Sequence, residues 1–89
     1  MSRDRAVTEL VLYTREGCAL CAAMKAVVLG VAERYPLQLR EIDVDASAEL
    51  QQQYGAEVPV LFINGRKAFK YRVTPPELAK RLRRERTLR

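Results

Sequence analysis

Two cysteines, Cys18 and Cys21, are the residues of this chain whose types and spacing could do chemistry. If a helix begins at Cys18, Cys21 lies one turn further along, close enough to form a disulfide. A thiolate attacks disulfides, and a helix N-terminus favours the thiolate because its unpaired N–H groups and its dipole stabilise negative charge. The pair therefore predicts thiol–disulfide exchange, in which the Cys18 thiolate attacks a target disulfide and Cys21 resolves the mixed disulfide.

Other interpretations of the pair stay open. Zinc sites use the same spacing, and two cysteines can be buried simply as small hydrophobes. A dimer could hold an iron–sulfur cluster or a metal with Cys18 from each chain, and a non-catalytic adaptor could act through its basic C-terminal segment. The chain has no histidine, which excludes Cys-His and Ser-His-Asp catalysis, and it has too few soft ligands for a mononuclear zinc site.

Charged residues near the pair bear on its reactivity. Arg15, three residues before Cys18, adds a cation, and Glu16 opposes it. Lys25 follows Cys18 by about two helical turns, so it either acts on the thiolate or is a solvated surface residue.

The segments around the pair indicate a βαβ unit, which is the context of a redox motif. The apolar run Leu10–Tyr13 predicts a strand that is buried on both faces. Helix-forming residues extend from Cys18 to about Tyr35, and Pro36 ends the helix. Leu37–Asp43 alternates as a second strand, so the two strands and the crossover helix form a right-handed parallel unit.

A short helix and a β-hairpin are predicted next. Asp45 or Ser47 caps the short helix, and Gly55 ends it. Val58–Ile63 has the composition of a strand, and Asn64-Gly65 is a strong hairpin signal because both residues tolerate positive φ. The return strand is expected to alternate, with one face formed by Phe69, Tyr71 and Val73.

The final helix has a clear start. Thr74 and Glu77 form a capping box, and Pro75 suits the first helical position. After Leu82 the helix is expected to fray. These elements predict an α/β fold of β-α-β-α-β-β-α order, with a four-stranded mixed sheet flanked by helices. Residues 1–89 form one domain, with a loose N-terminus over residues 1–8 and a basic tail over residues 83–89.

The charge distribution limits the partners. The net charge is +5, and the whole excess lies in Lys80–Arg89, so the body that carries the cysteines is neutral overall. The basic segment lacks interleaved aromatic residues, so nucleic acid is not an expected partner. No apolar run approaches the ~20 residues of a membrane span, and no apolar signal core follows Met1–Arg5. A monomeric cytoplasmic protein without a membrane segment is predicted.

The chain resembles the glutaredoxin family, a compact version of the thioredoxin fold. The resemblance extends from about Leu10 to Leu82. The segments that carry it are Leu12–Cys21, Ile42–Asp45, Val58-Pro59 and Asn64-Gly65.

The resemblance implies roles for particular residues. Cys18 would be the exposed nucleophile and Cys21 the resolving thiol. Val58-Pro59 would be a cis peptide bond packed against the active site, and the backbone of Val58 would pair with a bound peptide or glutathione. Arg15 would help to hold a glutathione carboxylate.

Three departures from the typical glutaredoxin pattern count against glutathione. Ala19-Leu20 replaces Pro-Tyr, Glu57 replaces Thr, and Thr74–Pro76 stands in place of a Gly-Gly turn. No tightly bound cofactor is expected. The expected partners are disulfides of proteins or small molecules, and a reductant that is either glutathione or a thioredoxin-reductase-type system.

Overall fold

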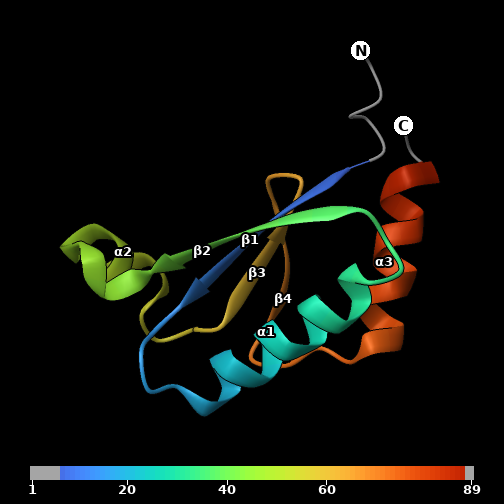
Figure 1. The fold of residues 1–89 in the computed structure, drawn as a ribbon. Coiled ribbons are helices and arrows are strands. Elements are labelled where there is room, and N and C mark those ends of the chain that lie inside the picture. The colour runs from blue at the N-terminus through green and yellow to red at the C-terminus, as the bar shows by residue number, and fades with distance from the viewer. Residues whose placement is uncertain (1–6, 88–89) are drawn as a thin grey trace.

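The computed structural model describes residues 7–87, with side chains up to residue 85. The elements follow the predicted order, with one additional 3-10 turn (Figure 1). The strands are β1 (Thr8–Thr14), β2 (Leu37–Asp43), β3 (Val60–Ile63) and β4 (Arg66–Lys70). The helices are α1 (Ala19–Ala32), α2 (Ala48–Tyr54) and α3 (Pro75–Thr87), together with the 3-10 helix η2 (Val44–Ala46).

The four strands form one mixed sheet in the order β2-β1-β3-β4. β1 runs parallel to β2, as the crossover through α1 requires, and β3 runs antiparallel to β1 and β4. Helices α1 and α3 pack together against the sheet, whereas α2 lies beyond the end of β2 (Figure 1). The predicted α/β architecture with a four-stranded mixed sheet is confirmed.

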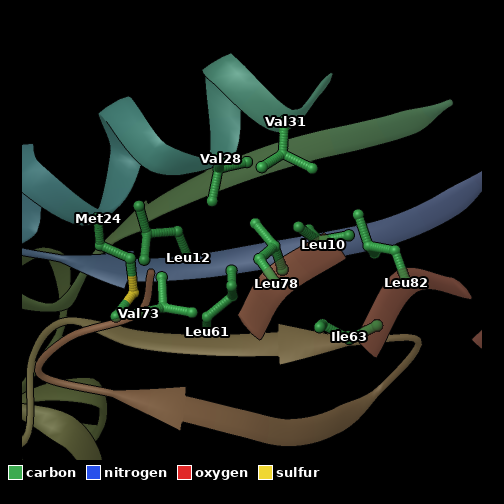
Figure 2. Close-up of a cluster of buried hydrophobic side chains, with 10 residues drawn as sticks. All are labelled: Leu10, Leu12, Met24, Val28, Val31, Leu61, Ile63, Val73, Leu78 and Leu82. Carbon is green, nitrogen blue, oxygen red and sulfur yellow. The ribbon is translucent and has the colours of Figure 1, made fainter. Parts of the chain in front are cut away.

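The hydrophobic core lies between the sheet and the two helices α1 and α3 (Figure 2). The α1 stripe inferred from three- and four-residue spacings supplies Met24, Val28 and Val31 to this core. The other members come from β1, β3, α3 and the loop before α3, and they are Leu10, Leu12, Leu61, Ile63, Val73, Leu78 and Leu82. No helix among residues 7–87 has the length and apolarity needed to cross a membrane.

Helix α1 ends earlier than predicted. Its last regular residue is Ala32 rather than a residue near Tyr35. The N–H groups of Glu33 and Arg34 bond to the carbonyls of Gly30 and Val31 at 3.3 and 2.9 Å, so the last turn tightens to an i→i−3 pattern. This tightening occurs just before Pro36, whose ring disfavours helical backbone in the residue that precedes it.

The hairpin between β3 and β4 has the predicted turn. Asn64 and Gly65 have φ values of 50° and 84°, which match a turn with two left-handed residues. Within the hairpin, Leu61 pairs with Phe69 but Phe62 pairs with Lys67, so Ala68 is an extra residue in β4. This β-bulge is not visible in the sequence pattern.

The predicted alternation of the return strand through Tyr71 and Val73 is wrong. β4 ends at Lys70, and Tyr71 adopts a left-handed conformation with φ of 72°. The Tyr71 N–H donates to the Pro59 carbonyl at 2.8 Å, which holds the chain in this turn. The left-handed backbone of Tyr71 breaks the alternation of the strand, so Tyr71 and Val73 do not share a face. Val73 is buried in the core, whereas Tyr71 is 42% exposed.

The basic C-terminal segment is helical rather than frayed. α3 continues to Thr87, and Glu85 within it is buried, so the prediction of a loose segment after Leu82 is wrong. The Arg83 guanidinium donates to the Tyr35 hydroxyl at 2.9 Å, which ties the segment to the end of α1. At the other end of the chain, Thr8 belongs to β1 rather than to a loose start, and residues 1–6 and 88–89 lie outside the described residues.

The predicted capping box at the start of α3 is present. The Thr74 hydroxyl accepts from the Glu77 N–H at 3.3 Å, and the Thr74 N–H donates to the Glu77 carboxylate at 3.0 Å. We expect Thr74→Ala to lower the free energy of unfolding by about 1 kcal/mol in urea titrations, because a backbone N–H loses its acceptor. Thr74→Ser keeps the hydroxyl and is the matched control. An equal loss in both variants would contradict a capping role.

Candidate active site at the Cys18–Cys21 pair

Cys18 and Cys21 form a disulfide at the N-terminal end of α1, with their Cα atoms 5.2 Å apart. Cys18 is the N-cap residue and has an extended backbone, with φ of −96° and ψ of 114°. Its sulfur accepts a hydrogen bond from the Cys21 N–H at 3.1 Å, and its carbonyl accepts from the Ala22 N–H at 3.1 Å. One sulfur is therefore at the helix N-terminus and the other is one turn inside.

The two sulfurs differ in accessibility. Cys21 is 3% exposed, whereas Cys18 is partly exposed. Gly17, immediately before Cys18, has φ of 76°, a conformation that side-chain-bearing residues rarely adopt. This glycine allows the loop after β1 to turn into the helix with Cys18 outward, so an approaching molecule meets Cys18 first.

Arg15 links the active-site loop to the segments that follow β2 and precede β3 at the same end of the sheet. Its guanidinium donates two hydrogen bonds to the Asp45 carboxylate, both at 3.1 Å, and a third to the Gly55 carbonyl at 3.2 Å. Hydrogen bonds from Arg15 and from Gln51 lower the pKa of Asp45 below its usual value. The cation that the resemblance assigned to a glutathione carboxylate is thus already paired within the protein.

Of the two residues predicted as possible caps of the short helix, one has that role and the other does not. Asp45 pairs with Arg15, and Ser47 alone caps α2 by accepting from the Leu50 N–H at 3.1 Å. Gly55 ends α2 as predicted, and because its φ is an ordinary helical −56°, the reason for a glycine here is the lack of room for a side chain. A Cβ there would lie 2.5 Å from the Gln51 carbonyl oxygen and 3.3 Å from the Arg15 guanidinium.

A cavity of about 350 Å³ opens beside the cysteines and is lined by both of them. Lys25 lies on its wall, and its ammonium group pairs with Glu41 at 2.8 Å. The sequence placed the Lys25 charge near Cys18. In the structure this charge is paired with the carboxylate of Glu41 in β2. Glu41 itself carried no signal in the sequence, because only the packing of α1 on β2 brings it to this cavity.

The Val58-Pro59 peptide bond is cis, as the resemblance implied. Pro59 is fully buried, and Val58 is partly buried. The Pro59 carbonyl accepts the Tyr71 N–H, and Tyr71 shares a small cavity with Leu20, the residue just before Cys21. The cis bond therefore lies one hydrogen bond away from a cavity that borders the cysteine motif.

Comparison with known proteins agrees with this fold. The model of the glutaredoxin-like domain family (DUF836) matches residues 9–83. This chain belongs to the glutaredoxin-like domain family. The glutaredoxin-like protein carries its cysteine pair within the matched region, at disulfide distance, which supports a redox-active centre.

Solved structures resemble this glutaredoxin-like protein over most of its length. The crystal structure of protein XcR50 from X. campestris shares 30% identity, covers 84% of this chain and 96% of that chain, and has a TM-score of 0.68. The solution structure of protein Ne2328 from Nitrosomonas europaea shares 29% identity, with coverages of 83% and 89% and a TM-score of 0.71. Chloroplastic thioredoxin z shares only 16% identity, with coverages of 94% and 82% and a TM-score of 0.74, so it supports the thioredoxin-like fold alone.

Two features of this glutaredoxin-like protein concern anion binding. The first is the carboxylate of Glu57, whose negative charge opposes the binding of an anion. A hydrogen bond and the charge of Lys67, followed by the charge of Lys70, lower the pKa of Glu57. The ammonium nitrogens of Lys67 and Lys70 lie 3.1 and 3.9 Å from this carboxylate. In the Thr74–Pro76 segment, the Thr74 N–H is bound to Glu77 and the prolines have none. This segment therefore has no free N–H groups for a carboxylate.

Metal ligands of the common kinds are not gathered in the described part of the chain. Among residues 7–87, no three side chains of the His, Cys, Asp or Glu type lie together as a possible metal site.

Proposed function

We propose that this glutaredoxin-like protein is a thiol–disulfide oxidoreductase. The observation that carries the proposal is a partly exposed Cys18 at the N-cap of α1 in a disulfide with a buried Cys21. Once the disulfide is reduced, the N–H groups and dipole of α1 stabilise a thiolate at Cys18. The accessible sulfur is then the nucleophile, and the buried sulfur is protected from external disulfides.

The reaction has two exchange steps. The Cys18 thiolate attacks one sulfur of a substrate disulfide, forms a mixed disulfide and releases the other substrate sulfur as a thiolate. The Cys21 thiolate then attacks the Cys18 sulfur, forms the Cys18–Cys21 disulfide and releases the second substrate thiolate. Two electrons pass from the protein to the substrate, and the leaving thiolates take up protons from the solvent.

A reductant must return two electrons to the Cys18–Cys21 disulfide. The candidates are glutathione, of which two molecules are oxidised per cycle, and a thioredoxin-reductase-type system. The pairing of Arg15 with Asp45 and the absence of free N–H groups at Thr74–Pro76 favour the second candidate. The cytoplasm, where we expect the protein to act as a monomer, supplies both reductants.

The pH dependence of Cys18 alkylation tests the proposal directly. In a reduced Cys21→Ser variant only Cys18 reacts with iodoacetamide. We expect the alkylation rate to rise with pH, with a midpoint between about pH 3.5 and pH 7.5, below the pKa of ~8.5 of a free cysteine. The same variant unfolded in urea is the control, and its midpoint returns to about 8.5. A folded-state midpoint at or above that of the unfolded control would contradict the proposal.

Anaerobic purification distinguishes the proposal from the alternative of an iron–sulfur or metal-binding dimer. We expect a colourless monomer whose two thiols titrate stoichiometrically. A coloured dimer that contains iron, and whose colour is lost in Cys18→Ser, would support the alternative. An adaptor that acts through its basic C-terminal segment would keep its biological activity in Cys18→Ser and lose it when the exposed Lys80 and Arg84 are replaced by Gln, which leaves the buried Glu85 in place.

A further inference from the structure

A groove of about 530 Å³ runs between α1 and α3, away from the cysteine pair. The two helices pack against each other (Figure 1), and exposed residues of both line the groove. Its volume falls within the roughly 300–1,000 Å³ of small-molecule pockets. Neither cysteine lines the groove, so it is a separate feature from the cavity that both sulfurs border.

The walls of the groove carry small side chains. Ala26 and Gly30 of α1 line one side, and Pro76 and Ala79 of α3 line the other. A Cβ at Gly30 would meet no atom within 4 Å, and Gly30 does not have a positive φ, so neither internal packing nor backbone conformation requires this glycine. Glycine weakens a helix interior relative to alanine. The space that Gly30 leaves is open to a molecule from outside.

Positive charge is concentrated at one end of the groove. Arg34 and Arg83 line it, and the Arg83 guanidinium donates to the Tyr35 hydroxyl at 2.9 Å, which places both arginines at the end where α1 finishes. Among residues 7–85, whose side chains the structure describes, Arg34 has no ion-pair partner. The Tyr35 hydroxyl accepts from Arg83 and keeps its own proton to donate. The groove therefore ends in hydrogen-bond donors that suit an anion.

We infer that this groove binds an amphipathic monocarboxylate, with its apolar body between α1 and α3 and its carboxylate at Arg34. Ala26 and Pro76 lie about two helical turns before Arg34 and Arg83, which gives the groove a length of about 12 Å. A guanidinium group binds a carboxylate through two parallel hydrogen bonds, so charge at one end only matches a single acidic head group. The inference does not depend on the proposed function, because neither sulfur takes part.

Titrations followed by the amide NMR signals at neutral pH test the inference. The probe is decanoate, whose extended chain matches the length of the groove. Decylammonium has the same kind of chain with the opposite charge, and acetate has the carboxylate without the chain. We expect decanoate to shift the signals of Ala26, Gly30 and Ala79, with a Kd on the order of 1 mM. This Kd should be at least about tenfold below those of decylammonium and acetate.

Two variants separate the contributions of the space and of the charge. Gly30→Leu fills the groove and is expected to raise the Kd for decanoate at least about tenfold, while its thermal midpoint stays equal or rises, because leucine is the better helix former. Gln53→Leu adds the same side chain at an exposed α2 position and should leave the Kd unchanged. Arg34→Glu is expected to reverse the preference between decanoate and decylammonium. Arg84→Glu changes the net charge equally, at an exposed α3 position outside the groove, and should leave that preference in place.

Two kinds of result would overturn the inference. Equal Kd values for decanoate and decylammonium, or decanoate binding that Gly30→Leu does not weaken, would show that this groove is not a carboxylate site. If the protein sediments as a dimer and Gly30→Leu converts it to a monomer, a second copy of the chain fills the groove and the inference is likewise wrong. Reduction of hydroxyethyl disulfide by Gly30→Leu is expected to equal that of the wild type, so either result leaves the proposed function standing.

Discussion

Cys18→Ser is expected to lower the rate of disulfide reduction by at least about a thousandfold, because it removes the sulfur that attacks the substrate. Cys21→Ser is expected to fail at a different step. The buried Cys21 acts only after the mixed disulfide has formed, so this variant still reacts through the partly exposed Cys18 and then accumulates the mixed disulfide.

Intact-mass spectrometry after a single turnover measures this difference. Reduced Cys21→Ser mixed with a disulfide-linked peptide should gain the mass of one peptide chain, and Cys18→Ser should not. Ala26→Ser is the matched control, because it places the same hydroxyl on an exposed α1 position and keeps both thiols. Accumulation of the adduct in Cys18→Ser rather than in Cys21→Ser would reverse the two roles.

The second large effect is expected at Glu85, the buried carboxylate of α3. Its side chain is 5% exposed, and it accepts hydrogen bonds from the Asn64 amide at 3.1 Å and from Arg81 at 3.2 Å. Asn64 also accepts the Glu9 N–H at 3.0 Å, so the carboxylate links α3 to the hairpin turn and to β1. We expect Glu85→Ala to lower the free energy of unfolding by about 2 kcal/mol, because the partly buried donors of Asn64 and Arg81 lose their acceptor.

This figure is below the 3–5 kcal/mol typical of a broken buried ion pair, because water can solvate the cations that are left. Arg81 is 22% exposed, and Arg66, 3.9 Å from the carboxylate, is 68% exposed. Urea unfolding at neutral pH measures the loss. Glu33→Gln, at an exposed carboxylate after α1, is the control and is expected to change stability by less than about 0.5 kcal/mol.

The Glu85 contribution should also depend on pH. Burial alone would raise the pKa of Glu85, but the hydrogen bonds from Asn64 and Arg81 and the charges of Arg81 and Arg66 lower it below its usual value. The stabilisation is therefore present above the unfolded-state pKa of about 4.3 and is lost as pH falls through the folded-state pKa. The stability difference between the wild type and Glu85→Gln should be full at pH 7 and should shrink below about pH 4. A difference that is independent of pH would contradict this assignment.

Local sequence determined much of the secondary structure and the placement of the two cysteines. β2 spans Leu37–Asp43 as predicted, the Asn64-Gly65 turn forms, and Thr74 and Glu77 close their capping box. The turn and the capping box depend on residues a few positions apart, and the alternation that predicts β2 is also local, although the backbone hydrogen bonds of β2 are made to β1. The Cys18–Cys21 pair belongs to the same class, because one helical turn fixes its geometry.

The tertiary structure decided the long-range contacts, both beside that pair and at the other end of the sheet. Arg15 meets Asp45 thirty residues away, and Asn64 meets Glu85 across twenty-one residues. Tyr71 takes its left-handed backbone in a turn that a bond to the Pro59 carbonyl holds. Neither hydrophobic periodicity nor turn propensity encodes such contacts, since they depend on how the sheet places β3, β4 and α2 beside the cysteine motif. The sequence alone therefore specified a pair of cysteines placed to form a disulfide, whereas the packing of distant segments determined the cavities beside it.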